Sequence, residues 1–219
     1  MPVLKRNKTN FHYLDEEEGI PLLFLHGLGS DSERTRELLG GMPDVRLIAP
    51  DFRGHGRTRY QGDTAAYRIP AFADDVLALL DHLGLDKTVL GGVSLGAAVA
   101  LSAAVRHPER VIGLVLVRPA WLNEPFPHNL DIFIRLGRLI EKHGVDDARI
   151  ALIEQPGFKA LQARSPDGID SLLRQLRRPQ AATAYEALTW LPASVPFLEW
   201  KELAACTFPS LVLTTGGDL

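Results

Sequence analysis

The chain has 219 residues, of which 46% are hydrophobic and 23% are charged, a composition that suits one α/β domain with a modest insertion. A formal net charge of −3 disfavours a nucleic-acid partner, and the single cysteine, Cys206, excludes an internal disulfide and fits a reducing compartment. The sequence shows neither a signal peptide nor a membrane-length apolar run, so we expect a cytoplasmic protein without a membrane partner and leave its oligomeric state open.

Short apolar runs alternate with helical patterns over the first half of the chain. An edge strand at 9–13 is expected ahead of four buried strands, at 21–26, 45–50, 88–93 and 111–117. A helix is predicted over 71–83 because five apolar side chains fall on one face: Phe72, Val76, Leu79, Leu80 and Leu83. Strands that alternate with helices predict an α/β fold, in which helices cover a mostly parallel sheet.

The most informative segment is residues 92–96, Gly-Val-Ser-Leu-Gly, which lie between an apolar strand at 88–90 and an alanine-rich helix over 97–105. A G-x-S-x-G sequence at a strand-to-helix turn holds its serine, here Ser94, in a strained and exposed conformation. Glycine is needed on either side because a side chain would collide with the neighbouring strand and helix. This context makes Ser94 a candidate nucleophile.

The strand pattern stops at about Trp121 and returns at 210–215. Helices are predicted between these points at about 130–143, 167–178 and 181–191. We therefore predict three parts: a core over 1–120, a helical lid over 121–205 that is inserted between core strands, and an incomplete return to the core over 206–219.

A serine hydroxyl becomes a useful nucleophile when a base accepts its proton and N–H groups stabilise the oxyanion. The turn itself offers one such donor, the backbone N–H of Leu95 at the start of the helix. The loop over 26–30 follows a buried strand and is rich in small residues, so we expect it to turn the Leu28 N–H inward as the second donor. We interpret His26 as a residue that braces this loop rather than as the base.

Three motifs occur in an order and at spacings that resemble the α/β-hydrolase superfamily. They are residues 25–29 (LHGLG), 51–58 (DFRGHGRT) and 92–96 (GVSLG), and residues 211–218 (LVLTTGGD) resemble the strand that leads to the acid loop. The resemblance covers nearly the whole chain and is to the compact, lid-bearing branch of esterases, lactonases and C–C hydrolases. It implies the α/β-hydrolase fold.

This resemblance implies a serine hydrolase that acts on a small ester, lactone, thioester or C–C substrate without a cofactor or metal. It assigns Ser94 as the nucleophile and the amides of Leu28 and Leu95 as the oxyanion hole. Serine at the turn argues against the haloalkane dehalogenases and most epoxide hydrolases, which use aspartate there.

In the family, the three triad residues occur along the chain in the order serine, acid, histidine. This chain departs from that order because no histidine follows its last predicted strand. All seven histidines precede the final predicted strand: His12, His26, His55, His82, His107, His128 and His143. The family's acid commonly occupies a G-x-x-D loop, which counted from Gly217 would place it at position 220, so Asp218 is only a fallback acid. We therefore expect a C-terminally truncated hydrolase whose last strand, last helix and base loop are missing, with the base histidine and the acid beyond residue 219.

Gly27, Arg118 and Trp121 are the candidate substrate-binding residues. Arg118 follows a buried strand at the end that should face the pocket, where it either anchors a substrate carboxylate or forms a salt bridge at the hinge of the lid. Aromatic residues are frequent in the predicted lid, and they either favour an apolar substrate or only attach the lid to the core: Trp121, Phe126, Phe133, Trp190, Phe197 and Trp200.

Two rival interpretations stand beside this one. A dinucleotide-binding fold would explain residues 27–32 (GLGSDS) and the strand-end Asp51, but serine replaces its third glycine and the 92–96 turn is left unexplained. In the hydrolase interpretation Asp51 and Arg53 instead hold a structural loop over 51–58. A non-hydrolytic protein of the same superfamily, such as a ligand receptor, a lyase or a cofactor-free oxidoreductase, would keep the fold, because fold does not fix function.

Overall fold

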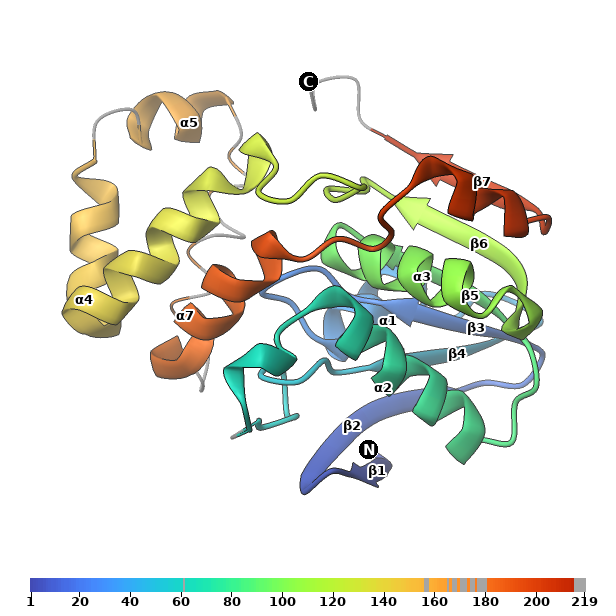
Figure 1. Cartoon of the computed structure of the whole chain (residues 1–219). Helices are drawn as coiled ribbons and strands as arrows, with labels where there is room; N and C mark the ends of the chain where they lie inside the picture. Colours follow the sequence, from blue (N-terminus) through green and yellow to red (C-terminus); the bar gives the residue numbers. More distant parts are fainter. Residues whose placement is uncertain are drawn as a thin grey trace.

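In the part of the chain that the structure describes, the strands form one seven-stranded sheet in the order β1-β2-β4-β3-β5-β6-β7 (Figure 1). The structure is a computed structural model and describes residues 1–60, 62–155, 158–164, 166, 169, 173, 176 and 181–214. The strands are β1 (Val3–Arg6), β2 (Thr9–Glu16), β3 (Ile20–Leu25), β4 (Val45–Pro50), β5 (Thr88–Val93), β6 (Val111–Val117) and β7 (Ser210–Leu213). β2 pairs antiparallel with β1 and β4, and the other neighbouring strands are parallel. The predicted α/β fold with a mostly parallel sheet is confirmed.

Helices cover the two faces of this sheet unequally. The α-helices are α1 (Ser32–Leu39), α2 (Ile69–His82), α3 (Leu95–Arg106), α4 (Asp131–Ile153), α5 (Phe158–Arg164) and α7 (Ala181–Trp190). The 3-10 helices are η1 (Thr64–Ala66), η2 (Pro108–Arg110), η3 (His128–Leu130), η4 (Leu191–Ala193) and η5 (Trp200–Ala205). α2 and α3 pack against each other in front of the sheet in Figure 1. On the other face Leu39 of α1 packs with Leu22, Phe24 and Leu47.

The helices α2 and α3 form where the sequence predicts them. α2 has Pro70 in its first turn, a position that tolerates proline because the missing N–H would have no partner there. Its predicted apolar face is buried at Phe72, Val76, Leu79 and Leu80. α3 is buried at every residue from 95 to 105, and its alanine side chains are small enough to let the helix lie close to β5 and β6.

Among the described residues, the face of the sheet opposite α3 is only partly covered toward the β7 edge. Valines of β5 and β6 are only partly buried there: Val89, Val93, Val115 and Val117. All four residues of β7 are exposed, including the apolar side chains of Leu211, Val212 and Leu213. The strand predicted at 210–215 is confirmed over 210–213, whereas β1 was not predicted by the sequence.

From the chain between β6 and β7, the helices α4, α5 and α7 lie beyond one end of the sheet, whereas η5 lies beside α3 (Figure 1). α4 and α7 approach closely at Gly137, where an added Cβ would lie 3.0 Å from the Cβ of Leu188. The predicted end of the first helix near 143 coincides with a kink at Gly144, where φ is 76°, and helix continues beyond it to Ile153. Most of the helix predicted at 167–178 lies outside the described residues, and α5 is an addition to the prediction.

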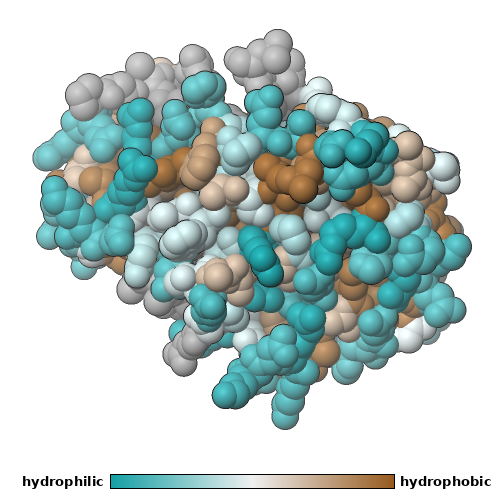
Figure 2. All heavy atoms as spheres, viewed as in Figure 1, coloured by the Kyte–Doolittle hydropathy of each residue, from teal (hydrophilic) through white to brown (hydrophobic). Residues whose placement is uncertain are grey.

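The surface is mostly hydrophilic on the face shown in Figure 2, with apolar side chains in separate patches. Trp190, Leu198 and Trp200, all from the chain between β6 and β7, are among the exposed large apolar residues. Within the described ranges, none of the helices is both long enough and apolar enough to span a lipid bilayer.

Candidate functional site

Ser94 occupies the sharp turn between β5 and α3. Its φ of 54° and ψ of −110° lie in a region that residues with a Cβ rarely adopt, and its side chain is half-buried. The Ser94 N–H donates to the carbonyl of Val117 at 2.9 Å, which continues the pairing of β5 with β6 and holds the turn against β6. The structure thus confirms the predicted strained backbone at this serine, but the residue is half-buried rather than exposed.

Gly92 and Gly96 make the turn possible because neighbouring backbone leaves no room for a Cβ. A Cβ on Gly96 would overlap the carbonyl of Leu25 at the end of β3, and one on Gly92 would overlap the carbonyl of Gly96. The predicted collisions with the adjacent strand and helix are therefore both present. They leave Ser94 as the one residue at the apex of the turn that carries a side-chain hydroxyl.

The loop after β3 lies directly beside Ser94. Leu25 pairs in register with Gly92, and a Cβ built on Gly27 would lie 3.7 Å from the Cβ of Ser94. Leu28 and Leu95 are buried. The Leu95 amide is in the first turn of α3, where N–H groups have no intrahelical acceptor. Because β3 and β5 are parallel neighbours, the two predicted oxyanion-hole segments meet at the same end of the sheet.

His26 is fixed by both of its ring nitrogens. The Phe52 N–H donates to His26 Nε2 at 3.1 Å, so Nδ1 carries the proton and donates it to the Gly27 carbonyl at 2.8 Å. The imidazole is 1% exposed and lies against the Phe52 ring, with 4.6 Å between the ring centroids. These contacts agree with the interpretation of His26 as a brace of the loop and leave neither nitrogen for the Ser94 proton.

None of the other histidines is hydrogen-bonded to Ser94 in the described part of the chain. His55 is buried, and its Nδ1–H donates to the Arg53 carbonyl at 3.0 Å. The others lie on β2, at the C-terminal ends of α2 and α3, and in the chain between β6 and β7: His12, His82, His107, His128 and His143. His107 is near the surface beside Glu109.

The loop after β4 is held by Asp51, which is 1% exposed. Its Oδ1 accepts from the Ser32 N–H at 2.7 Å and its Oδ2 accepts from the Arg57 N–H at 2.8 Å. Both oxygens thus bind backbone of α1 and of the loop, and this agrees with the structural role predicted for the loop over 51–58. A ribose-binding acid would need an accessible carboxylate here, so the geometry argues against the dinucleotide interpretation.

Arg53 extends from the same loop into a buried ion pair with Asp75 of α2. Its Nε and Nη2 lie 2.8 and 2.5 Å from Asp75 Oδ2, and Arg6 lies 2.5 Å from Oδ1. The guanidinium also lies 4.9 Å from the centre of the Tyr60 ring. Burial raises the pKa of the Asp75 carboxyl, an effect that both arginines oppose by favouring the ionised form.

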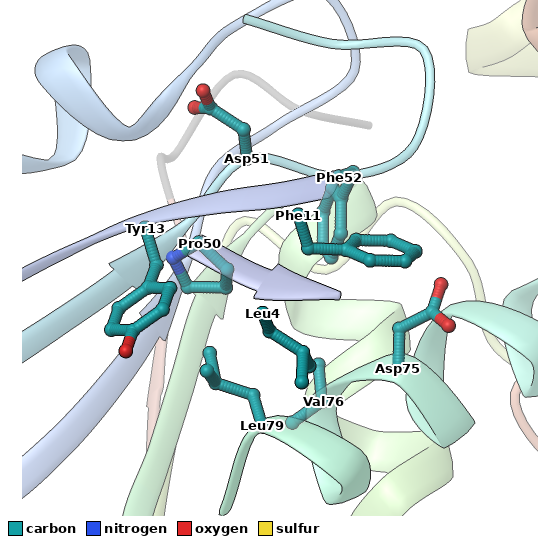
Figure 3. A pocket seen from close by; sticks show the side chains of 9 residues that line it. All are labelled: Leu4, Phe11, Tyr13, Pro50, Asp51, Phe52, Asp75, Val76 and Leu79. Carbon is teal, nitrogen blue, oxygen red and sulfur yellow. The ribbon is translucent and has the colours of Figure 1, made fainter. Parts of the chain in front are cut away.

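Asp75 was not singled out by the sequence, although its place gave a signal. It lies three residues from Phe72 and four from Leu79 on the buried face of α2, where an acid needs a cationic partner. Figure 3 shows it at the wall of a small pocket between α2 and the β1–β2 hairpin. That pocket is lined by Leu4, Phe11, Tyr13, Pro50, Asp51, Phe52, Asp75, Val76 and Leu79, and Ser94 is not among them.

Two of the predicted substrate-binding residues flank Ser94: Gly27 follows β3 on one side of β5, and Arg118 follows β6 on the other. Arg118 follows β6 directly beside Ser94, since Val93 pairs with Val117, and it has a positive φ of 47° and an exposed side chain. Its N–H donates to the Leu213 carbonyl of β7 at 2.7 Å. Trp121 is fully buried, and among the described residues its Nε1 has no hydrogen-bond acceptor.

The aromatic residues of the predicted lid divide between interior and surface. Trp121 and Phe197 are buried, whereas Phe126, Trp190 and Trp200 are exposed. The fallback acid Asp218 lies outside the described residues, as do all positions from 215 to 219. Among the described residues no group of three or more His, Cys, Asp or Glu side chains could hold a metal ion.

Comparison with known proteins agrees with this geometry. A family model for the alpha/beta hydrolase fold matches residues 20–129, half of the chain. A 2-hydroxymuconate semialdehyde hydrolase of Pseudomonas sp. (strain CF600) is 36% identical over 128 residues, which cover 57% of this chain and only 44% of that protein. The chain therefore matches less than half the length of this relative.

Solved structures match over most of the chain. A thermophilic esterase from Thermogutta terrifontis aligns with 94% of this chain and 75% of its own, with 28% identity and a TM-score of 0.66. The enol-lactonase from Burkholderia xenovorans LB400 aligns with 97% of this chain and 80% of its own, with 19% identity and a TM-score of 0.69. At that level of identity the second likeness concerns the fold alone.

Proposed function

The chain belongs to the α/β-hydrolase family, and on that premise we propose that it carries the nucleophile and the oxyanion hole of a serine hydrolase. The observation that carries the proposal is Ser94 itself: a serine held at φ 54° and ψ −110° between β5 and α3, beside the Gly27 loop. Strain of this kind persists where the surrounding structure enforces it, and it is concentrated at functional sites.

In the proposed reaction, Ser94 Oγ attacks the carbonyl carbon of a small ester, lactone, thioester or C–C substrate while a base takes the hydroxyl proton. The amides of Leu28 and Leu95 bind the oxygen that becomes negative, and each such donor is worth about 10²–10³ in rate. Collapse of the intermediate expels the leaving group, which receives the proton, and leaves an acyl group on Ser94. Water, activated by the same base, then releases the acid. The chemistry needs no cofactor.

We place the base, and with it the acid, outside these 219 residues, with Asp218 as the fallback acid. The support comes from the histidines: His26 has both nitrogens engaged, and none of the other six is hydrogen-bonded to Ser94 in the described part of the chain. A triad without its base retains some catalysis from its oxyanion hole and from substrate binding. Slow turnover by these 219 residues is therefore compatible with the proposal.

Substrate recognition is proposed to involve Gly27, Arg118 and Trp121, under a lid formed by residues 121–205. Gly27 lies against Ser94, and Arg118 follows the strand paired with the one that carries Ser94. The lid would meet the core where the Ile69 N–H donates to Ser194 Oγ at 2.9 Å. Small-molecule substrates agree with two of the named relatives, a semialdehyde hydrolase and, among the solved structures, an esterase.

A serine-directed fluorophosphonate probe tests the nucleophile. We expect Ser94 to be labelled, and the rate to rise with added imidazole, because the small base can accept the proton that no described histidine is placed to take. Mass spectrometry of the digested protein locates the label. Ser94→Ala should abolish labelling, while Ser102→Ala, which removes a buried hydroxyl of α3, should not change it. No label on Ser94 at any imidazole concentration would leave a binding-only protein as the better interpretation.

Because Arg118 lies beside Ser94, the preference of the site for a negatively charged substrate can be tested. If its guanidinium anchors a carboxylate, Arg118→Ala should lower kcat/KM on an ester with a free carboxylate by about tenfold or more, and change a neutral ester of equal size little. Arg118→Lys serves as the control that retains the charge. Equal losses on the two esters would remove the anchor and favour the salt bridge at the lid hinge.

A further inference from the structure

We propose that Asp75 and His26 are positioning residues that together aim the Leu28 amide at the oxyanion, through a continuous series of contacts from α2 to the loop after β3. The proposal rests on the proposed role of Leu28. It adds that the accuracy of the oxyanion hole depends on a buried carboxylate in another element, which does not contact the substrate.

The first step lies within one peptide group. The carbonyl of Gly27 and the N–H of Leu28 belong to the same planar trans unit, so they point in opposite directions. The Gly27 carbonyl accepts from His26 Nδ1–H at 2.8 Å and from the Ser30 N–H at 3.1 Å. Two donors thus hold the carbonyl on one side, and the Leu28 N–H is thereby fixed on the other.

The second step fixes the imidazole that supplies one of those donors. Nε2 of His26 accepts the Phe52 N–H, and the ring lies against the Phe52 ring with centroids 4.6 Å apart. Phe52 in turn packs on Phe72 of α2, with 5.1 Å between centroids. A histidine held at both nitrogens and by a neighbouring ring cannot rotate without losing several contacts. The position of Phe52 therefore sets the position of His26.

The third step fixes Phe52 through its neighbour Arg53. Two nitrogens of the Arg53 guanidinium bind one oxygen of Asp75, and both side chains are nearly completely buried. The guanidinium also lies over the rings of Tyr60, Phe72 and Phe11. Removing one partner of a buried charge pair leaves the other charge without compensation, so separating Arg53 from Asp75 is costly and the contact geometry is maintained. That geometry positions the Arg53 backbone and, with it, the Phe52 N–H.

Asp75→Asn with Asp74→Asn as its control tests this series. The two aspartates are adjacent in α2, but Asp74 pairs at the surface with Arg106 and has no described link to the loop. We expect Asp75→Asn to raise amide hydrogen exchange over residues 26–30 by about tenfold or more, and Asp74→Asn to leave it unchanged. At saturating fluorophosphonate with imidazole present, Asp75→Asn should slow labelling of Ser94 by about 10–100-fold without weakening probe affinity. Equal exchange over 26–30 in the two variants would overturn the proposal.

Arg53→Lys decides the case if Asp75→Asn does not fold. Lysine keeps the charge but cannot bind with two nitrogens in a fixed plane, so it should reproduce the exchange and labelling defects in milder form. His26→Gln, which offers one donor and one acceptor, should recover more of the labelling rate than His26→Ala. If wild type is never labelled at Ser94, the hydrolase proposal fails, yet the exchange comparison still decides whether α2 positions the loop.

Discussion

The backbone conformation of Ser94 is strained, and this strain lowers the stability of the fold. Its φ of 54° and ψ of −110° suit glycine, yet serine is present. A residue in so sparsely populated a region typically carries about 1–3 kcal/mol of strain, which the pairing of β5 with β6 and the packing of α3 must offset. Arg118, the residue next to it on the neighbouring strand, also has a positive φ. The two residues follow neighbouring strands, and both carry side chains that the proposed function uses.

Glycine at position 94 should stabilise the fold. We expect Ser94→Gly to raise the free energy of unfolding by about 1 kcal/mol relative to Ser94→Ala, because both lack the hydroxyl but only glycine relieves the strain at the turn. Urea denaturation with linear extrapolation measures the difference. Equal stability of the two variants would mean that the turn is not strained.

Residue-level reasoning from the sequence succeeded where a residue's neighbours along the chain define its environment. Ser94, Gly92 and Gly96 could be interpreted this way because strand, turn and helix are contiguous. Asp75 could not be, because its partners Arg53 and Arg6 come from a loop and a strand that are distant in sequence. Its burial is visible in the helical pattern, but the identity of the cation that compensates it depends on tertiary packing.

The unit formed by β5, the turn and α3 is the element that sets the site. α3 begins immediately after Ser94 and is buried along nearly its whole length, and its contact with the end of β3 is close enough that only glycine fits at position 96. The same contact brings the Gly27 loop to Ser94. The position of α3 and the position of the oxyanion loop therefore both depend on the close contact between the backbone of Gly96 and that of Leu25.

Substitution of Gly96 should destabilise the fold much more than substitution of a glycine within the sheet. A Cβ at position 96 would overlap the Leu25 carbonyl, so we expect Gly96→Ala to lower the free energy of unfolding by about 2–4 kcal/mol, since backbone must shift. Gly113→Ala in β6 is the matched control, because its Cβ would find its closest neighbour at 3.6 Å. It should cost less than about 1 kcal/mol. Denaturation of both variants under the same conditions makes the comparison, and similar losses would contradict it.

At the scale of elements, the spacing of apolar residues and the positions of glycine and proline predicted most helices and strands. The elements that were missed have physical causes. β1 has only four residues and gains its pairing from β2, so no pattern of its own identifies it. The helix predicted to end near 143 does break at Gly144, but helix resumes because the following residues can still pack, with Ala148 and Leu152 buried. A local breaker indicates a change of direction and does not decide whether helix continues.

For the molecule as a whole, the sequence predicted the class of fold but not the strand order. Alternation of strands and helices indicates a parallel sheet, whereas the placement of β4 outside β3 depends on crossovers that no local pattern encodes. The candidate site follows the same division. Its nucleophile and oxyanion loop are local motifs on adjacent strands and could be predicted. The base and the acid come from parts of a chain that are distant in sequence, so their positions stay proposals.

The separation of β6 from β7 along the chain affects how this protein is made. Leu114 and Ser210 pair in adjacent strands but are 96 positions apart. At a synthesis rate of about 5–20 residues per second, β6 leaves the ribosome roughly 5–20 s before its partner exists. During that interval the strand beside Ser94 is an unpaired apolar edge in a nascent chain, the kind of surface that chaperones bind and that promotes misassembly. The segment that is proposed to recognise the substrate thus also sets the longest delay in assembling the sheet.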